Sequence, residues 1–242
     1  MNFKGRKFKV TVVIGGIMLA CVLVLVSPLF HVQEIVIQGT VRVCQTEIRD
    51  RLGLDNGNNI LMFNPRSARD RIMGNLHVGD VNFVRDMPGR LYVIIRERRP
   101  SAYVEHTPGN FLVLDDSGRV LEIRHHMDVS LPLLEGLQFT RYQLGEILEV
   151  TNTTDFSSIV HYTQLLITHN LIHTITHINV SDPSNIRILV DYMEFHVGCT
   201  TDADYKVRAI SQMLEVSPGA GIMRGYVDMR VRRPEYFFVL LQ

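Results

Sequence analysis

The feature that most constrains this chain is an uncharged stretch over residues 10–30, VTVVIGGIMLACVLVLVSPLF. A helix of roughly 20 residues, at about 1.5 Å each, spans the ~30 Å hydrocarbon core of a bilayer. Lys4, Arg6, Lys7 and Lys9 precede the stretch, and basic flanks stay on the cytoplasmic side. The sequence therefore predicts a cytoplasmic basic tail (residues 1–9), one transmembrane helix (residues 10–30) and an extracytoplasmic remainder at the plasma (inner) membrane.

A cleaved signal peptide is the alternative for this segment. The apolar part of a signal peptide usually runs for about 7–15 residues and ends in small residues of the A-x-A type. Here the apolar run is longer and ends Leu-Val-Ser-Pro-Leu-Phe. We therefore expect a retained anchor.

Charge and cysteine content argue against a nucleic-acid-binding protein and against a disulfide-stabilised scaffold. The chain has 25 basic and 25 acidic residues, and four basic residues lie in the first thirty, so the remainder carries 21 against 25, or −4. That balance excludes a basic nucleic-acid footprint on the main body. Three cysteines, Cys21, Cys44 and Cys199, are too few for a disulfide scaffold. Whether Cys44 and Cys199 pair stays open, with unpaired thiols as the default.

Residues 31–99 predict a small α+β unit in the order strand, helix, helix, strand, strand. The segment VQEIVIQGT alternates as a strand does, and Gly53 suits the end of a short helix that closes at Leu52. Asn64 followed by Pro65 predicts a second helix start. Two strands, VGDVNFVRD and GRLYVIIRER, follow, so we expect one sheet with both helices on one face.

Residues 100–242 predict a mostly antiparallel β domain with two helices. Expected strands include SAYVEH, the hairpin FLVLDDSGRVLEI, the short pieces LPLLEGL and LGEIL, then ITHINVSD, NIRILVDYMEFHVG and GYVDMRV. Helices are expected from Asp155 to about His169 and from Asp202 to about Glu215. The overall fold class is α+β.

Histidines and one pair of carboxylates invite a catalytic or metal interpretation. His169, His173 and His177 are spaced by four, but β-branched neighbours favour a strand, where that spacing is about 13 Å. Asp115 and Asp116 precede Ser117 and Gly118, which favours a turn over an acid/base pair. We predict no catalytic residue, no metal site and no cofactor. A membrane-anchored cell-wall hydrolase or metalloprotein using the His-rich segment is the alternative function.

The last expected strand, EYFFVLLQ (residues 235–242), is the candidate binding segment. A strand that is apolar on both faces is normally a central one, covered on both sides and purely structural, and that is the alternative here. At a chain end it could instead lie at a sheet edge and accept a strand from another protein. In the preceding strand, Asp228 and Arg230 share a face and could bracket the site. The predicted partner-binding residues are Asp228, Arg230, Tyr236, Phe237, Phe238, Val239 and Leu240.

The ordered motifs resemble the FtsQ/DivIB family of bacterial cell-division proteins. A basic tail and anchor are followed by VQEIVIQGT, EIRDRLGL, GNNILMFNP and the most specific segment, VRDMPGRLYVIIRERRPSAYV; LVLDDSGRVL, LPLLEGL and GYVDMR come next. The resemblance implies a POTRA-type βααββ domain over residues 31–99 and the family's β domain over residues 100–242, with partners along its final strands.

The resemblance also implies a non-enzymatic role. It predicts a single-pass scaffold of the divisome, located at the division septum, that binds small single-pass proteins of the FtsL and FtsB/DivIC types. Such a scaffold would bind no small-molecule substrate and would help control septal peptidoglycan synthesis. Cys44 departs from the pattern, because Ser or Thr commonly caps that helix.

Overall fold

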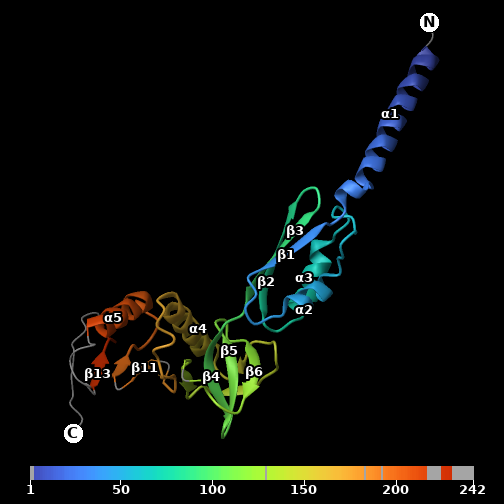
Figure 1. Ribbon diagram of the computed structural model, residues 1–242. Helices are drawn as coiled ribbons and strands as arrows, with labels where there is room; N and C mark the ends of the chain where they lie inside the picture. Colours follow the sequence, from blue (N-terminus) through green and yellow to red (C-terminus); the bar gives the residue numbers. More distant parts are fainter. Residues whose placement is uncertain (1–2, 129, 183, 192, 217–224, 231–242) are drawn as a thin grey trace. The chain divides into compact units, whose positions relative to one another are not determined.

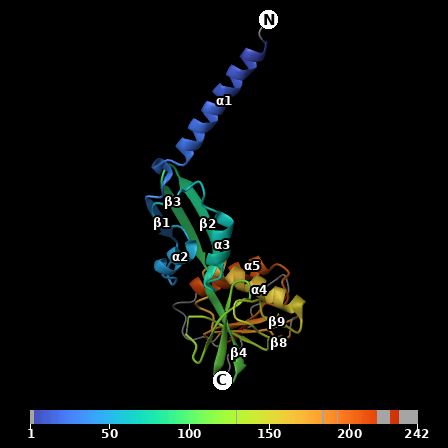
Figure 2. The same cartoon turned by 90° about the vertical axis from the view of Figure 1, so that its right-hand side faces the viewer.

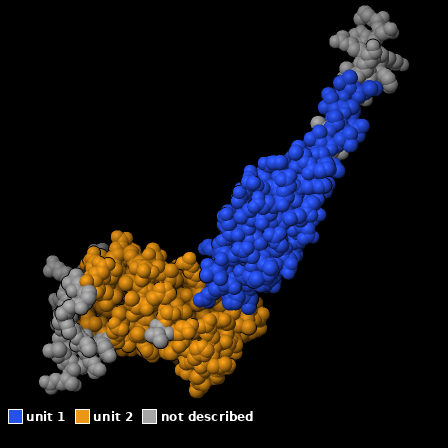
Figure 3. Space-filling model, in the orientation of Figure 1, with its two compact units in different colours: residues 1–98 blue, residues 99–242 orange. Residues whose placement is uncertain are grey.

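The computed structural model describes residues 3–128, 130–182, 184–191, 193–216 and 225–230. The chain divides into two compact units, residues 1–98 and residues 99–242, which are coloured separately in Figure 3. Each unit has a hydrophobic core of its own.

Unit 1 begins with the helix α1 (Phe3–Leu25), followed by one 3-10 turn, η1 (Pro28–Phe30) (Figure 1). The helix stops short of the end of the apolar stretch because a residue before proline disfavours the helical conformation, and Ser27 is extended (φ −64°, ψ 153°). Ile17 and Leu23 are 60% and 64% exposed. No helix in the described part of the chain is both long and apolar enough to cross a bilayer, and the expected membrane helix over residues 10–30 is not confirmed.

The rest of unit 1 has the predicted order of elements. It consists of β1 (Glu34–Gln38), α2 (Gln45–Leu52), α3 (Pro65–Met73), β2 (Val78–Asp86) and β3 (Arg90–Glu97). Among the described residues these strands form a three-stranded sheet in the order β1-β3-β2, with β1 parallel and β2 antiparallel to β3. Both helices lie on one face of it (Figure 1).

Local sequence signals determine the helix ends in unit 1. Gly53 adopts the left-handed conformation (φ 62°) after α2, where a side chain would be strained. The Asn64 side chain accepts hydrogen bonds from the amides of Arg66 and Ser67 at 3.1 and 3.3 Å. Cys44 occupies the N-cap of α2 without a side-chain capping bond. The departure from the usual Ser or Thr at this position thus leaves the start of α2 without a side-chain cap.

Strand alternation separates the two faces of the unit 1 sheet. Leu91, Val93 and Ile95 of β3 are buried against the helices, at 0%, 0% and 3% exposure. Ile94, which points the other way, is 41% exposed. This alternation follows from the way successive side chains of a strand point to opposite faces.

Unit 2 is mainly strands. Its elements are β4 (Pro100–Thr107), β5 (Asn110–Asp115), β6 (Val120–Arg124), β7 (Leu133–Glu135), β8 (Phe139–Arg141), β9 (Glu149–Val150), α4 (Thr153–Thr168), β10 (His177–Asn179), β11 (Arg187–Val190), β12 (Met193–His196), α5 (Ala203–Val216) and β13 (Gly225–Asp228). The described residues form an eight-stranded sheet in the order β13-β12-β11-β10-β7-β4-β5-β6. Its antiparallel pairings outnumber the parallel ones, which join β4 to β7, β7 to β10 and β12 to β13.

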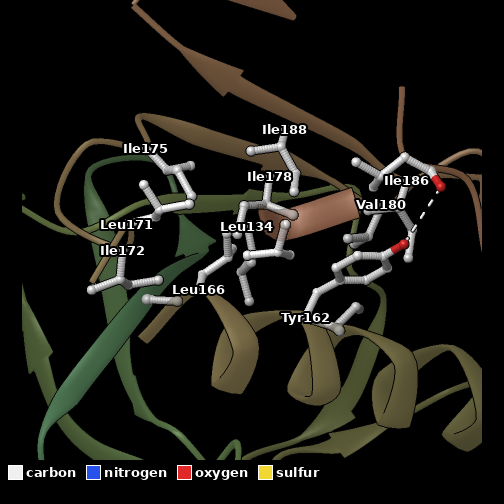
Figure 4. Close-up of a cluster of buried hydrophobic side chains, with 14 of the residues drawn as sticks. Leu134, Tyr162, Leu166, Leu171, Ile172, Ile175, Ile178, Val180, Ile186 and Ile188 are labelled. Atoms are coloured by element: carbon white, nitrogen blue, oxygen red, sulfur yellow. Dashed lines mark hydrogen bonds between the residues drawn. The ribbon is translucent and has the colours of Figure 1, made fainter. Parts of the chain in front are cut away.

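The core of unit 2 lies between this sheet and the helices α4 and α5. Figure 4 shows Leu166 of α4 directed toward Ile178 of the sheet and Tyr162 directed toward Ile186, and all four are at most 1% exposed. Elsewhere on α4, Ile159 is 3% exposed and Leu166 fully buried, while Leu165 is only partly buried. The helices therefore cover one face of the sheet.

Two predicted features of unit 2 differ from the structure, and one observed feature was not predicted. The segment expected as one strand, NIRILVDYMEFHVG, forms two antiparallel strands, β11 and β12, because Asp191 turns the chain with a positive φ of 51°. LGEIL is a turn with one isolated bridge at Ile147. The two-stranded sheet β8–β9, labelled in Figure 2, was not predicted. Two- and three-residue strands carry too little alternation to predict.

Candidate partner-binding surface

The candidate surface is built on the two strands at one end of the unit 2 sheet. β12 and β13 pair in parallel, with Phe195 beside Val227 and His196 beside Asp228. Phe195 and Val227 point into the core and are 0% and 1% exposed. Because side chains alternate along a strand, His196 and Asp228 lie on the face opposite the helices.

β13 is the terminal strand of the sheet within the described residues. A terminal strand has backbone N–H and C=O groups on one side that its neighbour in the sheet does not use. Such an edge can accept a strand from another chain through main-chain hydrogen bonds. The position of β13 is therefore compatible with strand addition.

Asp228 and Arg230 form the best-defined polar contact at this end. Arg230 lies just beyond β13, and its Nη2 donates to Asp228 Oδ2 at 2.5 Å while its Nε donates to Asp228 Oδ1 at 3.0 Å. Hydrogen bonding from Arg230 lowers the pKa of Asp228 to about 2. The side chain of Arg230 remains 48% exposed. The pair is pre-organised, with the guanidinium partly available to solvent.

An aromatic stack continues the surface beside this pair. The rings of His196 and Tyr226 are stacked at 5.1 Å between centroids and 28° between planes. Glu194 lies next to them, with its Oε1 3.6 Å from His196 Nε2, and it accepts a hydrogen bond from Arg187 Nη1 at 3.1 Å. Aromatic and arginine side chains are those most enriched in protein interfaces.

Further along the same face, the sheet carries a shallow groove of about 320 Å³. Its lining residues are Glu135, His177, Asn179, Arg187, Leu189 and Glu194. Neighbouring strands place Asn179 between Glu135 and Arg187, and Arg187 next to His196. The polar face thus continues from β7 to β13.

Two buried polar side chains hold the β12–α5 connection under this surface. Lys206 Nζ donates to the carbonyl oxygens of Val197 and Cys199 at 2.7 and 3.2 Å. The Tyr162 hydroxyl donates to the same two oxygens at 3.4 and 2.8 Å, and the dashed line in Figure 4 marks one of these bonds. Burial lowers the pKa of Lys206 and raises that of Tyr162.

Gly198 completes the connection. Its φ is 64°, and a Cβ at this position would lie 3.0 Å from Arg230 Cγ. Glycine therefore fits both the left-handed backbone and the close approach of Arg230.

Tyr236, Phe237, Phe238, Val239 and Leu240 lie outside the described residues. Of the predicted partner-binding residues, Asp228 and Arg230 are described, and the structure brings them together.

The three histidines of the alternative metal site do not converge. His169 Nε2 lies 3.1 Å from Asp204 Oδ1, and His173 Nδ1 lies 2.8 Å from the carbonyl oxygen of Ser130. His177 Nδ1 lies 2.8 Å from Glu135 Oε1. The described residues contain no group of three or more potential metal ligands.

Asp115 stabilises a turn, and the two cysteines outside α1 are free thiols. Asp115 is 2% exposed, and its Oδ1 accepts hydrogen bonds from the amides of Ser117 and Arg119, both at 2.9 Å, which is the predicted turn. Cys44 and Cys199 are both exposed free thiols.

Sequence reasoning missed the supporting residues of this surface. Lys206 falls on the buried stripe of α5 with Ala203, Val207 and Ile210, so a lysine on an apolar stripe was the available signal. Tyr226 precedes Asp228 by two positions and therefore shares its face. His196 had no signal, because its neighbour Asp228 is 32 positions away in the sequence (228 minus 196).

Comparison with known proteins identifies relatives over both units. Residues 30–98 match the family model described as POTRA domain, FtsQ-type. Cell division protein DivIB of Clostridium botulinum (strain Hall) is 23% identical over 240 residues, which cover 98% of this chain and 93% of the relative. DivIB of Clostridium tetani is 23% identical over 214 residues, covering 88% and 80%. Cell division protein FtsQ of Bradyrhizobium diazoefficiens is 29% identical over 108 residues, covering 44% and 31%.

Proposed function

We propose that this chain, which belongs to the FtsQ/DivIB family of bacterial cell-division proteins, is a non-enzymatic scaffold of the divisome. The family resemblance predicted from the sequence is confirmed by the matches to DivIB and FtsQ proteins. In this proposal the chain binds small single-pass proteins of the FtsL and FtsB/DivIC types. Through them it helps to control septal peptidoglycan synthesis.

The proposed topology is a single-pass membrane protein with a cytoplasmic N-terminus. Residues 1–9 form the basic tail, 10–30 the membrane anchor, 31–99 the POTRA-type domain and 100–242 the β domain. The uncharged stretch and the basic residues before it support this assignment. Asn59 Nδ2 also donates to the carbonyl oxygen of Leu25 at 2.7 Å, so the end of α1 is bonded directly to the segment that joins α2 to α3.

The proposed partner site is the β13 end of the unit 2 sheet together with residues 236–240. The observation that carries it is the position of β13 at the end of the described sheet, next to the exposed Arg230 guanidinium and the His196–Tyr226 stack. An added strand would gain register from main-chain bonds and selectivity from these side chains.

A binding measurement tests this site. In a full-length Phe238→Lys variant, we expect pull-down of the FtsB/DivIC-like partner to weaken at least about tenfold, because a charge replaces an apolar anchor. Val41→Lys is the matched control, since Val41 is 92% exposed in unit 1 and its replacement should leave binding unchanged. Undiminished binding by a folded Phe238→Lys variant would reject strand addition at this end.

A further inference from the structure

The opposite end of the unit 2 sheet is the strand β6. Within the described residues, β5 is the only strand that pairs with it. Val120, at its start, also exchanges hydrogen bonds with the segment 145–147: Gly145 N donates to Val120 O at 2.8 Å, and Val120 N donates to Glu146 O at 2.9 Å. The remainder of β6, from Leu121 to Arg124, has no such neighbour in the described part of the chain.

This edge carries an exposed apolar side chain at its centre. Ile123 pairs with Leu112 of β5, which is fully buried, so Ile123 lies at the margin of the unit 2 core. It is nevertheless 42% exposed, and Ile147, beside the start of the same edge, is 50% exposed. Exposed branched apolar residues at a sheet edge favour association with another strand.

The charges on either side of Ile123 are arranged symmetrically. Glu122 and Arg124 flank it, lie on the opposite face and form an ion pair, with 2.7 Å between Arg124 Nη2 and Glu122 Oε1. Arg124 also contacts Asp128 Oδ2 at 2.5 Å. An antiparallel copy of this strand reads in the reverse direction. If the two copies are centred on Ile123, Glu122 of each lies opposite Arg124 of the other.

We infer that this chain forms a two-fold symmetric dimer through antiparallel pairing of β6 with β6 of a second copy. Ile123 then contacts Ile123 of the second copy, and two Glu122–Arg124 pairs form across the interface, where opposite charges directly across strands are favourable. The inference does not depend on the proposed partner site. It leaves β13 accessible, so that one dimer carries two partner sites.

The charge pattern allows a reciprocal test with the full chain. Two copies with different affinity tags are co-expressed, extracted in mild detergent and purified on one tag, and the fraction of the other copy recovered is measured. Glu122→Arg in both copies places arginines opposite each other twice, and Arg124→Glu does the same with glutamates. Each change should lower recovery at least about tenfold. Mixing one Glu122→Arg copy with one Arg124→Glu copy restores both pairs and should restore recovery.

Arg124→Glu also removes the contact between Arg124 and Asp128 within one copy. Variants at other positions therefore test the interface without changing that contact. Ile123→Asp should also abolish self-association, because it places two carboxylates together at the centre. Ile94→Asp, at 41% exposure in unit 1, is the matched control and should have no effect. Three results would overturn the inference. The unmodified chain could fail to self-associate, or its association could be unaffected by these variants, as it would be if the copies paired through α1. The third such result is failure of the mixed copies to reassociate.

Discussion

The two buried donors at the β12–α5 connection should act as one unit. Tyr162 and Lys206 donate to the same pair of carbonyl oxygens, those of Val197 and Cys199. A double-mutant cycle with Tyr162→Phe and Lys206→Met removes each donor while largely retaining side-chain volume. We expect the two losses of stability to be strongly non-additive.

The expected magnitudes follow from the bonds that remain. Tyr162→Phe removes the 2.8 Å bond to Cys199 O, but Lys206 still donates to that oxygen, so the cost is about 1 kcal/mol. Lys206→Met removes a charge-assisted bond but also the burial of an ammonium group, and its net cost is roughly 1–2 kcal/mol. With both donors gone, the buried carbonyl of Val197 and the partly buried carbonyl of Cys199 lose their side-chain donors, and the double variant should lose about 1–2 kcal/mol more than the sum of the single variants.

Urea unfolding followed by circular dichroism provides the assay, with the transition of unit 2 fitted separately because two units need not unfold together. Tyr142→Phe is a control outside this cluster, since its ring packs edge-on against His106 at 4.6 Å. Additivity within about 0.3–0.5 kcal/mol would refute the shared-acceptor interpretation.

Three further outcomes are expected. The pKa of Asp228 is about 2 in the folded chain against an ordinary value of 3.8. The ionised carboxylate therefore stabilises the folded chain fully above pH 3.8, and this stabilisation is lost as the pH falls through 2. Because Arg230 is half exposed, Asp228→Asn should remove only about 1 kcal/mol of this acid-dependent stability, measured by urea unfolding between pH 2 and 5. Asn64→Ala should cost about 1 kcal/mol and Asn64→Ser much less, seen as a lower melting temperature of unit 1, because serine also caps the α3 amides. Although burial opposes it, the amides of residues 43, 42 and 41 lower the pKa of Glu97, so Glu97→Gln should destabilise unit 1 by about 1 kcal/mol and reduce hydrogen-exchange protection of the Val41 and Val43 amides.

Unit 1 could be predicted closely because its signals are local. The cap at Asn64, the left-handed Gly53 and the alternation of β3 each act within a few residues. Unit 2 was predicted less well. Asp191 carries a positive φ that is usual for glycine, and the chain around it is otherwise rich in strand-forming residues. The turn between β11 and β12 therefore had no clear sequence signal.

The candidate surface depends on contacts that no local pattern contains. Asn179 lies beside Glu135 because β7 and β10 are parallel, and His196 lies beside Asp228 because β12 and β13 are parallel. A parallel pair requires a crossover connection, which here contains α4 in one case and α5 in the other. The helices therefore have two roles. Together they bury the same face of the sheet. Each also forms part of a crossover that brings polar residues distant in sequence side by side on the other face.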